Sequence, residues 1–62
     1  MNMYKFSYST PKDSSKVTVC LIIDNRKLLF SGIYRKESNT VYSEEWNALF
    51  EVKDGDMWRY AE

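Results

Sequence analysis

The stretch YSEEWNALFEVKDGDMWRY, residues 42–60, decides the fold, because two structures compete for it. In a helical interpretation, Ser43 caps the N-terminus and the two acids that follow lie in the first turn, where the helix dipole favours them. Trp46, Leu49 and Phe50 then share one face of the helix. The helical interpretation therefore explains both the acids and the apolar spacing.

In the competing interpretation, residues 49–60 form a hairpin around Asp54-Gly55, a strong short-range turn signal. Strand alternation through this region would, however, place Glu44 on the same face as Trp46. We therefore expect a helix over residues 44–50, a turn at Asp54-Gly55 in which Asp54 and the following Asp56 are both solvated, and a final strand over residues 56–60.

The first part of the chain predicts strands. Residues 3–8 alternate strictly, which predicts a half-buried strand with Tyr4, Phe6 and Tyr8 on one face. A loop with Pro11 follows over residues 9–16.

The segment over residues 16–23 is rich in β-branched residues and is apolar on both faces towards its end. We expect an interior strand covered on both sides, which a turn at residues 24–27 joins to an antiparallel strand over residues 27–34. Gly32 in that strand indicates a bulge or the close approach of an aromatic ring. A turn at residues 36–39 and a short strand over 40–42 complete this part.

These elements predict a single α+β domain over residues 1–62. It would be a small curled antiparallel sheet of about four strands, with one short helix packed on a face. The alternative is a five-stranded SH3-like or OB-like β-barrel, because short strands with polar turns also fit that architecture.

The small size limits how the fold is stabilised, because 62 residues bury only roughly 60% of the surface that the unfolded chain exposes. Cys20 is the only cysteine and there is no histidine, so neither an internal disulfide nor a common zinc site is available. We expect no cofactor and no metal. Ten aromatic residues must supply the packing, and they also make a homodimer a reasonable expectation.

The location is predicted from the cysteine and the N-terminal segment. Cys20 lies in the apolar run VTVCLII, which predicts a buried, inert thiol. One unpaired cysteine is typical of a reducing compartment, and residues 1–16 show no signal-peptide pattern. We expect a cytoplasmic protein that does not enter a membrane.

The residue types argue against catalysis. Without histidine there is no Ser-His or Cys-His pair, and with two glycines there is no glycine-rich phosphate loop. We therefore expect a binding protein and not an enzyme.

Charge is uneven along the chain, with seven basic against three acidic residues in 1–42 and two basic against six acidic residues in 43–62. The second half also concentrates residue types that are common in protein interfaces. We predict a non-catalytic protein-binding module that contacts a basic protein surface. The predicted contact residues are Met57, Trp58, Arg59 and Tyr60 as anchors, and Glu44 and Glu45 as steering charges.

Inhibitors that bacteriophages and mobile elements direct at host proteins are typically small, lack catalytic groups and have a surface rich in interface residues, as this sequence does. That expectation rests on size and composition alone. The alternative function is a small nucleic-acid-binding sheet, in which aromatic rings stack on bases and basic groups contact phosphates. It would use Lys5, Tyr34, Arg35 and Lys36 of the basic half.

Overall fold

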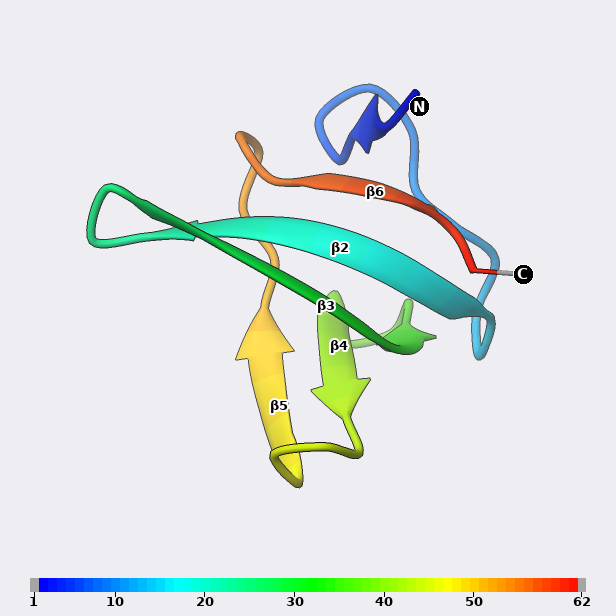
Figure 1. Ribbon diagram of the computed structural model, residues 1–62. Coiled ribbons are helices and arrows are strands. Elements are labelled where there is room, and N and C mark those ends of the chain that lie inside the picture. Colours follow the sequence, from blue (N-terminus) through cyan, green and yellow to red (C-terminus); the bar gives the residue numbers. More distant parts are fainter. Residues whose placement is uncertain (1, 62) are drawn as a thin grey trace.

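The computed structural model describes residues 2–61, which form one antiparallel sheet and contain no helix. The described strands lie in the order β1-β6-β2-β3-β4-β5, and the sheet is open (Figure 1). Their bounds are β1 (Tyr4–Lys5), β2 (Lys16–Ile23), β3 (Arg26–Arg35), β4 (Thr40–Ser43), β5 (Ala48–Glu51) and β6 (Met57–Tyr60). The protein is therefore all-β, and the predicted α+β class with about four strands is wrong.

The segment predicted as a helix, residues 44–50, is a loop followed by a strand. Ser43 Oγ does accept a hydrogen bond from the backbone N–H of Trp46 at 3.3 Å, as a helix cap would. The turn ends at once, because Asn47 adopts a φ of 49°, in the left-handed region. The Asn47 Oδ1 atom accepts a hydrogen bond from the Tyr42 hydroxyl at 2.6 Å. The chain thus reverses and pairs back on β4.

The hairpin also explains why the apolar spacing was misleading. From the β4–β5 loop, the ring of Trp46 lies 5.4 Å from that of Phe30 and 5.8 Å from that of Phe50. Leu49 points to the opposite side of the sheet and is 63% exposed. Helical spacing predicted one shared face, but the hairpin divides these residues between two faces.

The two alternatives, a hairpin over residues 49–60 and a five-stranded barrel, also differ from the structure. Residues 49–60 do not form a hairpin, because β5 pairs with β4 whereas β6 lies between β1 and β2. A five-stranded barrel is not formed either, since residues 2–61 give six strands whose edges, β1 and β5, do not pair.

The β2–β3 hairpin is confirmed, and β2 has the predicted bounds. Asp24 and Asn25 adopt φ values of 51° and 62°, so they make the two-residue turn that suits the twist of paired strands. Residues 26–33 of β3 pair with β2 and residues 33–35 pair with β4, so β3 passes from one neighbour to the other (Figure 1).

Gly32 lies where β3 changes partner. A Cβ atom there would come within 2.8 Å of Val41 Cγ1, within 3.0 Å of the Tyr42 carbonyl carbon, and closer still to the Tyr42 carbonyl oxygen. The β4 backbone, together with the Val41 side chain, makes this close approach, so the predicted approach of an aromatic ring is wrong. The absence of a side chain lets the sheet curl at this point.

The strand predicted over residues 3–8 is much shorter. Only β1 is extended, because the backbone N–H groups of Tyr8 and Ser9 both donate to the Lys5 carbonyl, at 2.9 and 3.1 Å. Phe6 is consequently buried, whereas Tyr8 is almost fully exposed. The predicted shared face is therefore wrong.

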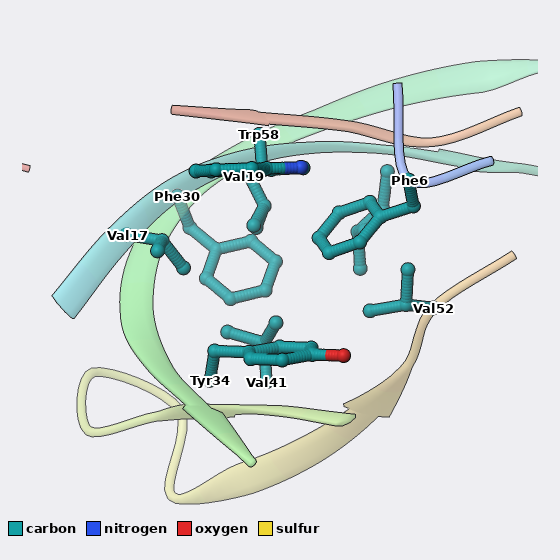
Figure 2. Packing of buried hydrophobic residues seen from close by; sticks show 9 residues of the cluster. Phe6, Val17, Val19, Phe30, Tyr34, Val41, Val52 and Trp58 are labelled. Atoms are coloured by element: carbon teal, nitrogen blue, oxygen red, sulfur yellow. The ribbon is translucent and has the colours of Figure 1, made fainter. Parts of the chain in front are cut away.

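The curled sheet encloses a core to which β2, β3, β4 and β6 contribute (Figure 2). The Phe6 ring lies between Tyr34 and Trp58, at centroid distances of 5.9 and 6.2 Å. The Trp58 indole N–H donates to the Ser9 carbonyl at 2.9 Å, which fixes the N-terminal segment over the core. The buried hydrophobic residues are Phe6, Val17, Val19, Leu21, Phe30, Tyr34, Val41, Val52 and Trp58.

The predicted turn at Asp54-Gly55 is confirmed, but one of its acids is not solvated. Asp56 is only 1% exposed. Its Oδ1 accepts a hydrogen bond from the backbone N–H of Ile22 at 2.9 Å, and its Oδ2 from that of Lys53 at 2.8 Å. This carboxylate ties the end of β2 to the turn before β6.

Candidate protein-binding surface

Only one side of β2 is buried. Val17, Val19 and Leu21 point into the core, whereas Ile22 is 44% exposed and Cys20 is partly exposed. The prediction of an interior strand is confirmed by its two neighbours, β3 and β6, but the predicted cover on both sides is wrong. The predicted burial of the thiol is likewise only partial.

The side chains that point away from the core form what we call the outer face. It follows from the alternation of side chains along each strand and from the cross-strand register. Its members are Lys5, Lys16, Thr18, Cys20, Ile22, Lys27, Leu29, Ser31, Ile33, Arg35, Thr40, Tyr42, Leu49, Glu51, Met57 and Arg59.

The centre of the outer face is apolar. Cys20 lies opposite Leu29 of β3 on one side and opposite Met57 of β6 on the other. Ile22 is the next outward residue along β2. Leu29 is 65% exposed, more than any other leucine, isoleucine or valine among the described residues. We call Cys20, Ile22, Leu29 and Met57 the Leu29 patch.

Basic side chains flank this patch. Lys27 lies opposite Ile22, and Lys5 lies opposite Met57. Arg59, two residues beyond Met57 on the same face, has a buried Nε atom with no hydrogen-bond partner among the described residues. The patch is therefore an apolar surface inside a positively charged margin.

Acidic residues are almost absent from the outer face. Glu51 of β5 is the only acid among its members, and it lies at the far edge of the sheet. The remaining acids of residues 2–61 lie in turns and loops: Asp13, Asp24, Glu37, Glu44, Glu45, Asp54 and Asp56. The charge imbalance along the sequence thus becomes a separation between a basic face and acidic turns.

The contact residues predicted on β6 are divided between two faces. Trp58 is 4% exposed and points into the core, so it has little surface for a partner (Figure 2). Tyr60 is exposed on the same side, and its hydroxyl accepts a hydrogen bond from the backbone N–H of Lys12 at 3.0 Å. Met57 and Arg59 point outward, beside the Leu29 patch. Only these two of the predicted anchors belong to the outer face.

The predicted steering charges are not near β6. Glu44 and Glu45 are exposed in the β4–β5 loop, and two strands, β2 and β3, separate β4 from β6 in the sheet. The structure therefore does not bring the acids and the β6 aromatic residues into one surface.

The predicted nucleic-acid contacts are also separated. Tyr34 is buried, and its hydroxyl donates to Asn39 Oδ1 at 2.7 Å, so its ring cannot stack on a base. Burial raises the pKa of Tyr34 above its ordinary value, and the negative charge of Asp13 raises that pKa further. Arg35 lines a hollow of about 750 Å³ together with Asp13 and Glu37, whose charges oppose phosphate binding.

Lys36 and Lys5 lie far apart in the sheet order. Lys36 is in the β3–β4 turn, where its backbone N–H donates to Asp13 Oδ1 at 2.9 Å, and Lys5 is on the edge strand β1. These two residues and Arg35 do not form one basic groove.

Four residues of the patch and its margin were not predicted from the sequence: Cys20, Ile22, Lys27 and Leu29. The signal was present, because a two-residue turn after Ile23 fixes Ile22 opposite Lys27 on one face. The apolar character of β2 on both faces, however, predicts a strand covered on both sides, which leaves no exposed patch there.

Among residues 2–61, no group of three or more histidine, cysteine or acidic side chains is placed to hold a metal ion. In the same part of the chain there is no helix with the length and apolarity needed to cross a membrane. The chain matches no protein-family model, no curated protein and no solved structure.

Proposed function

We propose that this chain is a non-catalytic protein-binding module that contacts its partner through the Leu29 patch and its basic margin. The observation that carries the proposal is the apolar patch on an uncovered sheet face, with Leu29 65% exposed at its centre. Contiguous apolar surface with a polar margin is typical of protein interaction sites.

The margin indicates the charge of the partner. Lys5, Lys27 and Arg59 surround the patch, whereas Asp56, whose carboxylate accepts the backbone N–H of Ile22, is buried. Complementary charge steers association and disfavours partners of like charge. We therefore expect an acidic protein segment that places aliphatic side chains on the patch, in place of the basic partner expected from the sequence.

Protein fits this surface better than nucleic acid does. Stacking on bases requires exposed aromatic rings. Among the described members of the outer face, only Tyr42 is aromatic. The exposed rings of Tyr4, Tyr8, Trp46 and Tyr60 lie elsewhere. The patch itself is aliphatic and sulfur-containing, which suits contact with apolar protein side chains.

A binding module of this kind acts as an adaptor or as an inhibitor that occupies a surface of its partner. The bacteriophage or mobile-element origin and the cytoplasmic location stay predictions.

Affinity capture with patch variants tests the proposal. The tagged wild-type protein, Leu29→Ser, Lys27→Glu and a control with both Glu44→Lys and Glu45→Lys are compared in native lysate, with and without nuclease. We expect a protein that survives nuclease treatment, is lost with Leu29→Ser, and is weakened with Lys27→Glu. The control, altered in the β4–β5 loop, should retain it.

Two results would contradict the proposal. Retention that depends on intact nucleic acid would assign the basic face to phosphate binding. A partner that is lost only in the loop control would move the site to the acids of the β4–β5 loop.

A further inference from the structure

The strand β5 ends the sheet at one edge. It pairs with β4 on one side, and no strand among residues 2–61 lies on its other side (Figure 1). An edge strand presents backbone N–H and C=O groups that can pair with another strand. The opposite edge, β1, has only two residues, so β5 offers the longer template.

The two faces of β5 present different side chains. Leu49 points outward and is 63% exposed, next to Tyr42 of β4, which in turn lies next to Ile33 of β3. Ala48 and Phe50 point to the inner side and are partly buried. A strand that pairs with β5 must therefore place an apolar side chain opposite Leu49 on the outer side. On the inner side it must fit beside one small residue, Ala48, and one large residue, Phe50.

We propose that β5 pairs antiparallel with β5 of a second copy of this chain, about a two-fold axis through Leu49. Directly opposite residues of paired strands share a face. In this register Leu49 lies opposite Leu49 of the second copy, and the small Ala48 lies opposite the large Phe50. The outer apolar row Ile33-Tyr42-Leu49 then continues across the axis into the same row of the second copy.

The other nearby register fits less well. A two-fold axis through Phe50 sets two large rings opposite each other on the inner side. On the outer side it sets Leu49 opposite Glu51, an apolar side chain against a charge. Opposite apolar pairs contribute favourably to a sheet, so the Leu49-centred register is preferred.

The charges near β5 limit the strength of self-pairing. In an antiparallel arrangement the loop before β5 of one copy lies beside the segment after β5 of the other. Glu44 and Glu45 are exposed in that loop, and Lys53 is exposed in that segment. Asp54 directly follows Lys53 in the same exposed segment, so acids outnumber bases where the two copies meet, and these charges weaken the contact.

The contact is small. A stable interface generally buries more than about 1,000 Å², and a four-residue edge pairing buries less than that. The dimer is therefore expected to be weak and to form in the upper micromolar range. It uses an edge that is separate from the Leu29 patch, so it is independent of the proposed protein partner.

Sedimentation equilibrium of the full chain tests the proposal over concentrations from about 10 μM to about 1 mM. We expect the average mass to rise with concentration from 7.4 kDa towards twice that value. A mass that stays at 7.4 kDa at the highest concentration would overturn the proposal.

Two matched variants locate the contact. Leu49→Lys places two like charges opposite each other across the axis and should abolish the rise in mass. Leu29→Lys changes an equally exposed leucine of the outer face away from the edge and should leave the rise intact. Circular dichroism checks that both variants are folded. If Leu29→Lys abolishes dimerisation and Leu49→Lys does not, the outer face is the contact and the proposal is wrong.

A cross-link keeps the test decisive if Leu49→Lys fails to fold. In a Cys20→Ser background, Leu49→Cys places two thiols opposite each other, within reach of a disulfide under oxidised glutathione. We expect a cross-linked dimer for Leu49→Cys and none for the control Leu29→Cys. Equal cross-linking of both variants would contradict the proposed register.

Discussion

Gly32→Ala is expected to destabilise the protein strongly, because the space for a side chain is occupied by backbone. The new Cβ would lie 3.0 Å from the carbonyl carbon of Tyr42, closer still to the Tyr42 oxygen, and 2.8 Å from Val41 Cγ1. Val41 Cγ1 can move with its rotamer, but the Tyr42 carbonyl is fixed in β4. The strands β3 and β4 must therefore separate locally.

The magnitude follows from the nature of this obstacle. Extra atoms in a well-packed interior cost about 1–3 kcal/mol, and a backbone obstacle places this substitution near the upper end, at about 3 kcal/mol. A core of this size rarely supplies more than about 3–5 kcal/mol in total. With a urea dependence of about 1 kcal/mol per M, the unfolding midpoint should fall by about 3 M.

Urea unfolding followed by tryptophan fluorescence and circular dichroism measures the effect, and Gly55→Ala is the matched control. A Cβ at Gly55 meets nothing within 4 Å, and Gly55 does not have a positive φ. This control should be neutral or more stable by about 0.4–1 kcal/mol, because alanine restricts the unfolded chain. Equal midpoints for the two variants would refute the close approach of β3 and β4.

Two further predictions concern buried polar groups. Asp56→Ala removes the buried carboxylate that accepts from two partly buried backbone N–H groups and should cost about 1–3 kcal/mol in urea unfolding, whereas Asp54→Ala in the exposed turn should change little. The raised pKa of Tyr34 predicts that its contribution to stability is complete below pH 10.0, the ordinary tyrosine value, and is lost as pH rises through its higher folded value. Tyr34→Phe should flatten that alkaline loss, and an unchanged slope would contradict the prediction.

The β2–β3 hairpin was predictable because its information is local. Asp24 and Asn25 tolerate the left-handed conformation that a two-residue turn requires, and the β-branched run before them favours a strand. Turn chemistry and strand propensity therefore agree over a few residues. The bounds of β2 followed without knowledge of any distant contact.

The segment over residues 44–50 was not predictable in the same way. The hydrogen bond from the Trp46 N–H to Ser43 Oγ is common to a helix start and to this hairpin loop, so the local signal does not distinguish them. The outcome depends on pairing with β4 and on the contact of Trp46 with Phe30, which is distant in sequence. Tertiary packing overrides the helical spacing here.

Predicting the candidate site likewise requires tertiary information, namely which face of β6 the folded sheet encloses. Alternation along β6 predicts that Trp58 and Tyr60 share one face and that Met57 and Arg59 share the other. The sequence does not say which face is enclosed, and the predicted contact residues Trp58 and Tyr60 require the aromatic face to be the exposed one. The core recruits Trp58 because a single curled sheet needs its largest side chains inside.

A single sheet that curls around its own core buries only one of its faces, so the Leu29 patch on the other face stays exposed. The inner face holds the buried aromatic residues, and no described element covers the outer face. A polar residue at position 29 would therefore leave the core intact, and Leu29→Ser should change the free energy of unfolding by less than about 0.5 kcal/mol. A leucine that the fold does not require is consistent with the proposed partner contact, and a large loss of stability in this variant would remove the reason for placing the partner there.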